Sequence, residues 1–359
     1  MWTTGAEQVE QAVAECAGLL GAVADREWEG VRAGRLEWSC RETAVHIAED
    51  LIAYAGQLAG REQEAYTPFE LSLEKGADNA GAVQVIRTTG ALLAAAVRTA
   101  PRDVRAFHPY PFRSANREGF AAMGVAEVLL HTHDIAEGLG VAYEPAPRLC
   151  DFVLTRIFPH VQLGPTPWAT LLWATGRGEL AGRAPLTEWR WNNNLVIGTE
   201  RLTLEGATPA AATDLSTVGD GGFAWVEGGP IDGTRVGAGL VYKQYEDGVH
   251  RPEWGMYVLV RREDDRAIGA MGFHSVPDPE GRIEVGYDLV EGARGHGYAT
   301  EALRALSRWA LGRPEVRTVV ANVERDNTPS QNVLTRAGFT QVAEDPEHLT
   351  YELREPHEG

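Results

Sequence analysis

The sequence of 359 residues has few cysteines and no long apolar run. Cys16, Cys40 and Cys150 are odd in number and widely spaced, which argues against a disulfide framework and against a thiolate metal cluster. No run approaches the roughly 20 apolar residues that cross a bilayer, so we expect no membrane partner. The first residues lack the basic and apolar regions of a secretion signal. Together these absences predict a cytoplasmic protein.

Basic residues are also scarce, with 33 Lys and Arg against 51 Asp and Glu and a net charge of −18. Residues 1–195 hold 17 basic and 24 acidic side chains (−7), and residues 196–359 hold 16 and 27 (−11). Because both halves are acidic, we expect no nucleic-acid partner. The negative field suits a cationic small-molecule or peptide acceptor, although plain solubility explains it equally well.

The chain is long enough for two ordinary domains. Helical apolar stripes dominate up to a turn of three asparagines, Asn192 to Asn194, and short alternating strands follow it. We therefore predict one domain over residues 1–193 and another over residues 194–359. Amphipathic patterns and a Ser39–Glu42 capping box predict four helices in the first domain, over residues 7–23, 40–58, 83–100 and 120–137.

Titratable side chains interrupt the apolar faces of two of these helices. His46 lies among apolar residues, and Glu127 and His131 are four apart, so they share one helix face. Burying such groups is costly unless they are paired or bound to metal. Two nitrogens and one oxygen leave an open position on a zinc ion. A satisfied core histidine and a solvent-facing pair are the alternatives that spacing leaves open.

The segments Trp38–Glu42, His46 and Glu127–Ile135 together resemble the DinB-like bundle of mycothiol-dependent maleylpyruvate isomerases. The resemblance implies an all-α bundle in which His46, Glu127 and His131 bind a divalent metal, usually zinc, that activates a low-molecular-weight thiol. For His133 and Asp134 we expect a surface role, with hydrogen bonding behind the metal ligands as the alternative. Residues 187–191 read as a strand at the end of this domain.

A glycine-rich turn organises the second half of the chain. Residues 283–289 alternate as a strand does, and helical periodicity begins at Ala299. The glycines between them can turn backbone N–H groups inward, and the helix adds its positive end, which suits a pyrophosphate. No Lys-Ser/Thr pair follows, and position 300 is Thr, so neither a P-loop nor a dinucleotide motif fits. A tight turn without ligand is the alternative.

This turn, Thr300–Leu303, the Asn327-x-x-Ser330 element and Ala337–Phe339 resemble the acetyl-CoA site of GNAT N-acetyltransferases, in the subgroup that acetylates protein N-termini and related amines. The order of predicted strands resembles the α/β (α+β) GNAT fold, with a mixed, mainly antiparallel sheet. The resemblance implies that acetyl-CoA is held by Leu289, Val290, Arg294, Gly295, His296, Gly297, Tyr298, Ala299 and Asn327.

Amide formation requires a base, because an alkylammonium with a pKa of about 10 must lose a proton before it attacks. Glu284 is the candidate, and a surface Glu is the alternative. Where many relatives have a tyrosine acid this chain has Leu334. Ser330 is the replacement candidate for meeting the departing thiolate, and a helix N-cap is its alternative role.

The acceptor is the least defined partner. Residues 223–254 contain aromatic and acidic side chains that suit an organic cation but could equally be core: Trp225, Tyr242, Tyr245, Trp254, Glu227, Glu246, Asp247 and Glu253. Three functions are compatible with the sequence. They are an acetyl-CoA-dependent N-acetyltransferase acting on a primary amine, a metal- and thiol-dependent transferase or isomerase, and a non-catalytic small-molecule or acetyl-CoA binding protein.

Overall fold

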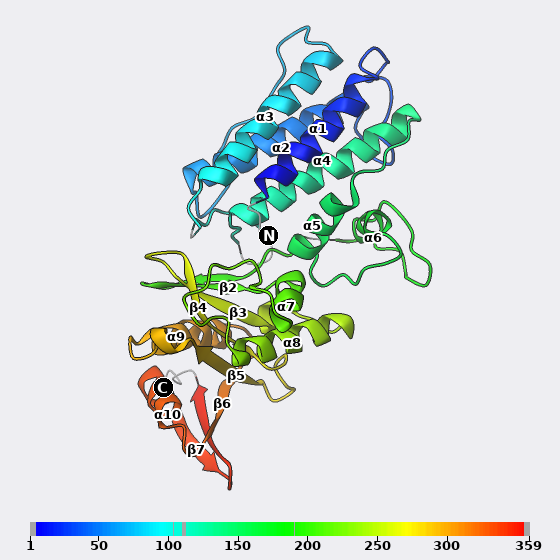
Figure 1. Cartoon of the computed structure of the whole chain (residues 1–359). Coiled ribbons are helices and arrows are strands. Elements are labelled where there is room, and N and C mark those ends of the chain that lie inside the picture. The colour runs from blue at the N-terminus through cyan, green and yellow to red at the C-terminus, as the bar shows by residue number, and fades with distance from the viewer. Residues whose placement is uncertain (1–4, 103, 110–112, 190, 355–359) are drawn as a thin grey trace. The chain divides into compact units, whose positions relative to one another are not determined.

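The computed structural model describes residues 5–102, 104–109, 113–189 and 191–354. The chain divides into two compact units, the first ending at Asn193 and the second beginning at Asn194. Figure 1 shows a helical first unit and a second unit built on a sheet.

Four long helices lie side by side in the first unit (Figure 1): α1 (Ala6–Gly21), α2 (Cys40–Gly60), α3 (Asn79–Thr99) and α4 (Arg117–Leu139). They correspond to the four predicted helices. Two further helices, α5 (Pro147–Ile157) and α6 (Pro167–Ala174), follow them. Neither α5 nor α6 was predicted. The eight residues of α6 are too few to show a period, whereas Leu149, Val153 and Ile157 of α5 recur at helical spacing, a signal that was missed.

Local side-chain chemistry sets the helix ends. The predicted capping box is present, since the Ser39 hydroxyl accepts from Glu42 N–H and the Glu42 carboxylate accepts from Ser39 N–H. Asp78 and Asn116 cap α3 and α4 without the reciprocal bond, since each side chain accepts from the N–H of a glycine three residues on, Gly81 and Gly119. Gly140 ends α4 with a φ of 65°, a conformation that favours glycine.

Helix α4 is the core of this unit. Its residues 118–126 and 128–132 are buried, a run long enough to cover every face of a helix. It packs against α1, α2, α3 and α5. Polar side chains on α4 that point toward α2 are therefore held away from bulk water.

Helix α3 is long and apolar enough, by length and composition, to cross a membrane, with a mean hydropathy of 1.4. The expectation that no run approaches this length therefore needs correction. Its buried residues, which include Val83, Ile86 and Leu93, belong to the bundle core. A core helix of a bundle meets the same criterion.

The predicted strand over residues 187–191 is wrong, apart from position 190, which lies outside the described residues. Trp189 and Trp191 pack instead against each other, with ring centroids 4.8 Å apart, and against Phe158. The alternation of large and polar residues reflects aromatic packing without a partner strand.

The second unit contains one sheet in the order β1-β2-β3-β4-β5-β6-β8-β7. The strands are β1 (Val196–Gly198), β2 (Leu202–Gly206), β3 (Met256–Arg261), β4 (Arg266–Phe273), β5 (Arg282–Leu289), β6 (Thr318–Glu324), β7 (Thr340–Glu344) and β8 (His348–Arg354). Among the named strands of the described residues, the β5–β6 pair is parallel and the other pairs are antiparallel. The predicted mixed, mainly antiparallel sheet is confirmed.

The parallel pair is short. Strands β5 and β6 are in register only from Arg282 opposite Thr318 to Glu284 opposite Val320. Beyond Glu284, β5 continues to Leu289 paired with β4 alone. The backbone groups on the open side of β5 therefore have no neighbouring strand, and a cleft begins there.

Four helices complete the unit: α7 (Pro209–Ser216), α8 (Asp232–Glu246), α9 (Tyr298–Leu311) and α10 (Thr328–Ala337). Short 3₁₀ turns, η1 (Pro252–Trp254) and η2 (Glu291–Ala293), precede β3 and the glycine turn. Ala238 and Val241 of α8 pack on Val258 and Val260 of β3 in one apolar core. Helix α9 contacts β2, β5, β6 and α10, so the start of α9 lies at the open side of β5.

Candidate active site and candidate metal centre

A cleft of about 670 Å³ lies where β5 separates from β6. Its walls come from the end of β5, the glycine turn, the start of α9 and the start of α10: Tyr287, Asp288, Leu289, Arg294, Gly295, Gly297, Tyr298, Ala299, Thr300, Asn327, Thr328, Pro329, Ser330, Asn332, Val333 and Arg336. The predicted phosphate turn is thus one wall of an open cleft and is not closed upon itself.

The start of α9 is suited to an anion. Gly295 and Gly297 both have a φ of 80°, and no side chain caps the helix. The N–H groups of its first turn, at Tyr298, Ala299 and Thr300, are of the kind that a helix leaves unsatisfied. Helix α10 differs, because Asn327 accepts from Ser330 N–H at 3.2 Å. Of these two helix ends in the cleft, α9 is therefore the one available to a phosphate group.

Most residues predicted to hold the cofactor line the cleft, namely Leu289, Arg294, Gly295, Gly297, Tyr298, Ala299 and Asn327. Two do not. The His296 ring lies 2.8 Å from the Arg294 carbonyl and stacks on Tyr298. Val290 N–H donates to the Ile268 carbonyl at 2.9 Å, which is ordinary sheet pairing.

A second hollow of about 610 Å³ adjoins the glycine turn and shares Gly297, Thr300 and Arg336 with the cleft. Its lining includes four arginines: Arg201, Arg304, Arg308 and Arg336. Arg201 lies 4.7 Å above the Tyr298 ring and donates to the His296 carbonyl at 2.9 Å. These arginines come from three separate segments, so their meeting could not be predicted from the order of residues.

A smaller pocket of about 150 Å³ lies on the other side of β5 and shares Tyr287 and Asp288 with the cleft. Its other lining residues are mostly apolar or glycine: Gly233, Val236, Gly237, Leu240, Met256, Ala270, Met271, Gly272, Phe273, His274 and Gly286. Two hollows that meet at one strand can bring two reactants together. Val236 and Leu240 are 67% and 41% exposed on one face of α8. Their spacing of four residues in the sequence was a signal for this pocket that we missed.

Tyr287 and Asp288 stand between the two hollows. The Tyr287 hydroxyl donates to the Ser330 carbonyl at 3.2 Å, and burial raises the pKa of this phenol. The Asp288 carboxylate accepts from the Thr234 hydroxyl at 2.9 Å and from Ala270 N–H at 2.9 Å. Burial raises the pKa of Asp288. Asp288 thereby fixes the start of α8 to the sheet beside the pocket.

Ser330 lines the cleft in the first turn of α10. Its alternative role as the N-cap is wrong, since Asn327 is the N-cap residue of α10. The hydroxyl of Ser330 is therefore not occupied by capping.

Glu284 lines neither hollow. Its carboxylate Oε1 lies 3.4 Å from His274 Nδ1 and accepts from Asn322 Nδ2 at 3.1 Å. The ion pair with His274 lowers the pKa of Glu284 and raises the pKa of His274. Glu284 is connected to the pocket through His274, whose position after β4 opposite β5 could not be derived without the strand register.

The aromatic residues predicted to hold a cationic acceptor do not line the small pocket. Trp254 is 4% exposed and packs against Phe273 and Trp309, so it is a core residue. Trp225 Nε1 donates to the Asp220 carbonyl, and Tyr245 stacks edgewise on His250. Of the two open interpretations of these residues, core packing therefore fits Trp254.

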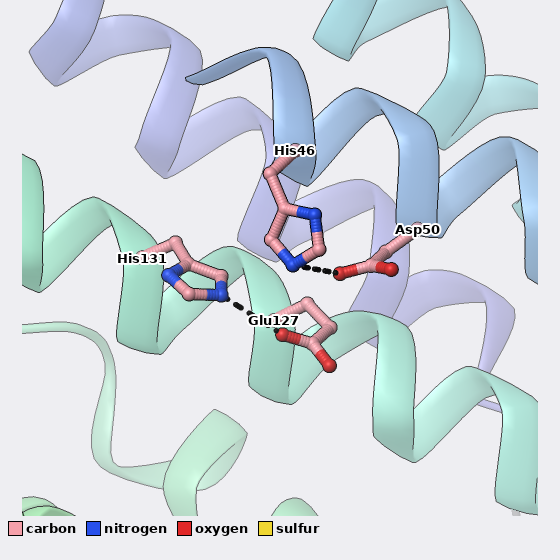
Figure 2. Close-up of side chains that lie close together, drawn as sticks. All are labelled: His46, Asp50, Glu127 and His131. Carbon is pink, nitrogen blue, oxygen red and sulfur yellow. Dashed lines mark ion pairs between the residues drawn. The ribbon is translucent and has the colours of Figure 1, made fainter. Parts of the chain in front are cut away.

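In the first unit, four side chains from α2 and α4 converge: His46, Asp50, Glu127 and His131 (Figure 2). One ligand atom from each lies within 4.8 Å of all the others. His46 Nε2 is 3.1 Å from Asp50 Oδ2, and His131 Nε2 is 3.2 Å from Glu127 Oε2. The three residues predicted as metal ligands are thus together.

Asp50 was missed, although it follows His46 by four residues, the same spacing that joins Glu127 to His131. Its Oδ2 is buried and lies 3.1 Å from His46 Nε2, but it accepts no well-directed hydrogen bond within the described part of the chain. Burial, followed by the nearby Glu127 charge, raises the pKa of Asp50. An unsatisfied carboxylate oxygen among two imidazoles and a second carboxylate matches the donor set of a divalent metal.

Asp134 has a buried role, so the expected surface role is wrong. Its Oδ2 lies 3.1 Å from His131 Nδ1 and 2.8 Å from Arg177 Nη2. Burial lowers the pKa of His131, but the bonds to Asp134 and Glu127 outweigh it and raise the pKa to about 9. The carboxylate orients the ring so that Nε2 faces the cluster, as partners of metal-binding histidines do.

A family model described as an acetyltransferase (GNAT) domain matches residues 201–340. The uncharacterized N-acetyltransferase YjdG of Bacillus subtilis (strain 168) is 36% identical over 83 residues, covering 23% of this chain and 49% of that protein. The uncharacterized N-acetyltransferase p20 of Bacillus licheniformis is 34% identical over 83 residues, covering 23% and 47%. The chain spans about half the length of the curated relatives it matches.

Solved structures are also similar to this chain. An acetyltransferase from Agrobacterium tumefaciens str. C58 is 30% identical, with a TM-score of 0.33, and the match covers 48% of this chain and 100% of that chain. The family model and the curated N-acetyltransferases match the half of the chain that carries the glycine turn and its cleft. The C-terminal half of this chain therefore contains a GNAT acetyltransferase domain, the domain of an acyltransferase.

Proposed function

We propose that the second unit transfers an acetyl group from acetyl-CoA to a primary amine, on a small molecule or a peptide N-terminus. The observation that carries this proposal is the uncapped start of α9, with two positive-φ glycines, facing a cleft of about 670 Å³. That wall can hold a pyrophosphate by backbone N–H groups. The open side of β5 extends from it toward the small pocket, which is where a thioester and an amine would meet.

The chemistry uses residues on both sides of β5. Glu284 is the base that the sequence suggests, acting directly or through water, and it would remove a proton from the acceptor ammonium. The amine then attacks the thioester carbonyl, the C–N bond forms and the C–S bond breaks. Ser330 in the cleft offers its hydroxyl to the departing thiolate.

The acceptor in this proposal enters through the small pocket. Its lining is mainly apolar, with His274, Tyr287 and Asp288 as the titratable groups. The lining favours an amine with an apolar neighbouring group, and the cationic character expected of the acceptor is limited to the ammonium itself. Burying an additional charge there would lack an opposite partner.

Acetyl transfer is tested with the purified full-length chain and acetyl-CoA labelled in its acetyl group. We expect labelled amide product and equimolar free CoA thiol with at least one amine from a panel of alkylamines, aminoglycosides and peptide N-termini. Tight acetyl-CoA binding without product or thiol release across the panel would favour a non-catalytic binding protein instead.

Arg336 connects the cleft with the arginine-lined hollow, so it is suited to a phosphate of the coenzyme. We expect Arg336→Ala to raise KM for acetyl-CoA about fivefold, since an exposed charge pair is weakened by salt and solvent. In the same variant, the KM values for acetyl-CoA and for its 3′-dephospho analogue should differ less than they do in the wild type. Arg354→Ala, an exposed arginine paired with Glu352, is the control and should leave both constants unchanged.

Ser330 is expected to act on the departing thiolate only. We expect Ser330→Ala to lower kcat about tenfold without changing KM for acetyl-CoA, because a hydrogen bond to a charged group contributes about 1.5–3 kcal/mol. Thr335→Ala removes a hydroxyl from the same helix, one that bonds only to the Gln331 carbonyl, and should not change kcat. Equal rates for the two variants would remove Ser330 from the chemistry.

A second function is proposed for the first unit, as a DinB-like domain that binds a divalent metal, with zinc as the expected ion. His46, Glu127 and His131 would hold it, and Asp50 adds a fourth oxygen ligand. A hollow of about 590 Å³, lined by His46, Trp38 and Arg41 among others, opens beside the cluster and could admit a low-molecular-weight thiol. A bound zinc ion would supply Lewis acidity that stabilises the thiolate form of that thiol.

A further inference from the structure

His274 lies where the small pocket meets strand β5. It lines the pocket together with Gly286 and Tyr287. A Cβ atom built on Gly286 would lie only 2.7 Å from His274 Nε2. The imidazole therefore rests directly over β5, at the residue before Tyr287, and only glycine admits it so closely.

Glu284 contacts this ring, and two further side chains from neighbouring strands hold the Glu284 carboxylate in place. His274 Nδ1 is 3.4 Å from Glu284 Oε1, and Asn322 Nδ2 donates to the same oxygen at 3.1 Å. Asn322 in turn accepts from the Thr350 hydroxyl at 2.8 Å. A carboxylate facing Nδ1 keeps the proton of a neutral imidazole on that nitrogen. Nε2 then carries the lone pair, and it has no hydrogen-bond partner within the described residues.

We infer that His274 is the catalytic base that removes the proton from the acceptor ammonium, and that Glu284 is a positioning residue acting through it. This inference rests on the proposed acetyl transfer and refines the route of its proton. Glu284 lines neither hollow, whereas His274 lines the pocket beside Tyr287 and Asp288, the residues shared with the cleft.

The step balances in protons and electrons. One ammonium proton moves to His274 Nε2, and the freed nitrogen lone pair forms the C–N bond to the thioester carbonyl. The C–S bond breaks, and the sulfur takes the bonding pair. The thiolate receives the second proton that the nitrogen releases, and His274 returns its proton to solvent. An amide and a free CoA thiol result.

The surroundings of His274 set the sign of its pH dependence. Glu284 on β5 faces the ring, Gln244 from the neutral face of α8 donates to its carbonyl, and His348 on β8 acts on Glu284 from beyond. The Glu284 charge raises the pKa of His274 above its usual value. Because a base must be neutral, the rate should rise as pH passes this raised pKa. Removing the Glu284 charge should move that rise to lower pH.

The test measures kcat/KM of the full-length chain from about pH 5.5 to about pH 9.5, with acetyl-CoA and with n-hexylamine, phenethylamine and a peptide N-terminus as probe amines. We expect His274→Gln to lower kcat/KM by about 100- to 1,000-fold and to abolish the rise of kcat/KM with pH. The affinity for acetyl-CoA should stay unchanged. Glu284→Gln should keep at least about a tenth of the wild-type kcat/KM at high pH, and its kcat/KM should begin to rise at a lower pH than in the wild type.

His160→Gln is the control, because it removes an exposed histidine of the first unit that lines neither hollow. Its rate should stay within about twofold of wild type, the scatter expected for a surface substitution. A His274→Gln variant that keeps the wild-type kcat/KM and its rise with pH would overturn the inference. The inference would also be overturned if Glu284→Gln were inactive at every pH while His274→Gln stayed active. No transfer by the wild type to any probe would instead overturn the proposed function itself, and this inference with it.

Discussion

Replacing Gly295 with aspartate is expected to weaken acetyl-CoA binding by about 100-fold, or about 2.7 kcal/mol. Gly295 lines the cleft in the glycine turn with a φ of 80°, which aspartate tolerates better than most residues. A Cβ atom there would meet nothing within 4 Å, so the new side chain fits. Its charge would lie beside the bound pyrophosphate, and like charges about 4 Å apart near a protein surface repel by up to about 4 kcal/mol.

Gly295→Asn is the control for this prediction. Asparagine has the same shape and the same tolerance of positive φ, but it carries no charge. We expect it to weaken binding less than about fivefold, measured by isothermal titration calorimetry on both full-length variants. Equal affinities for the two variants would show that no phosphate lies beside position 295. Raising the salt concentration should reduce the difference in acetyl-CoA affinity between the two variants.

Loss of metal from the first unit is the second large effect. The wild-type chain, purified without chelators, is expected to carry about one divalent ion per chain, and His131→Ala is expected to lose it. Chelation should lower the midpoint of thermal unfolding of this unit by about 10 °C, since a ligand present at about 1,000 times its Kd contributes about 4 kcal/mol. Metal content is measured by inductively coupled plasma mass spectrometry.

Two further variants make this result interpretable. Since His131 is buried and bonded to Asp134, its loss could also disturb packing, whereas His46 is partly exposed and can be replaced at less cost. His46→Ala should therefore lose the ion while the helices stay folded. His133→Ala removes a histidine of α4 outside the cluster and should keep it. A metal-free wild type, or full occupancy in His46→Ala, contradicts the proposed metal centre.

Features set by local chemistry were the ones that the sequence could predict. The Ser39–Glu42 capping box and the glycine C-cap of α4 depend on neighbouring residues only, so their helices were predicted with the observed boundaries to within a few residues. The glycine turn was found for the same reason. Thr187–Trp191 failed because its alternation serves tertiary packing of Trp189 and Trp191 on Phe158.

Residues that depend on strand register or helix packing were not predictable. His274 directly follows β4 and Glu284 lies on β5, 10 positions later, and only the β4–β5 pairing shows that they face each other. Asp50 could have been found from its spacing to His46, but most such pairs face solvent, so only the packing of α2 against α4 makes it informative. The arginines beside the cleft likewise meet only in the folded unit.

The central claim is that acetyl-CoA binds between β5 and the starts of α9 and α10. Hydrogen–deuterium exchange of the full-length chain, with and without acetyl-CoA, tests this location directly. We expect slower exchange at residues 294–301 and 327–333, with the exchange of the first unit's helices unchanged. Binding that leaves residues 294–301 unprotected, or protection confined to the first unit, would contradict the claim.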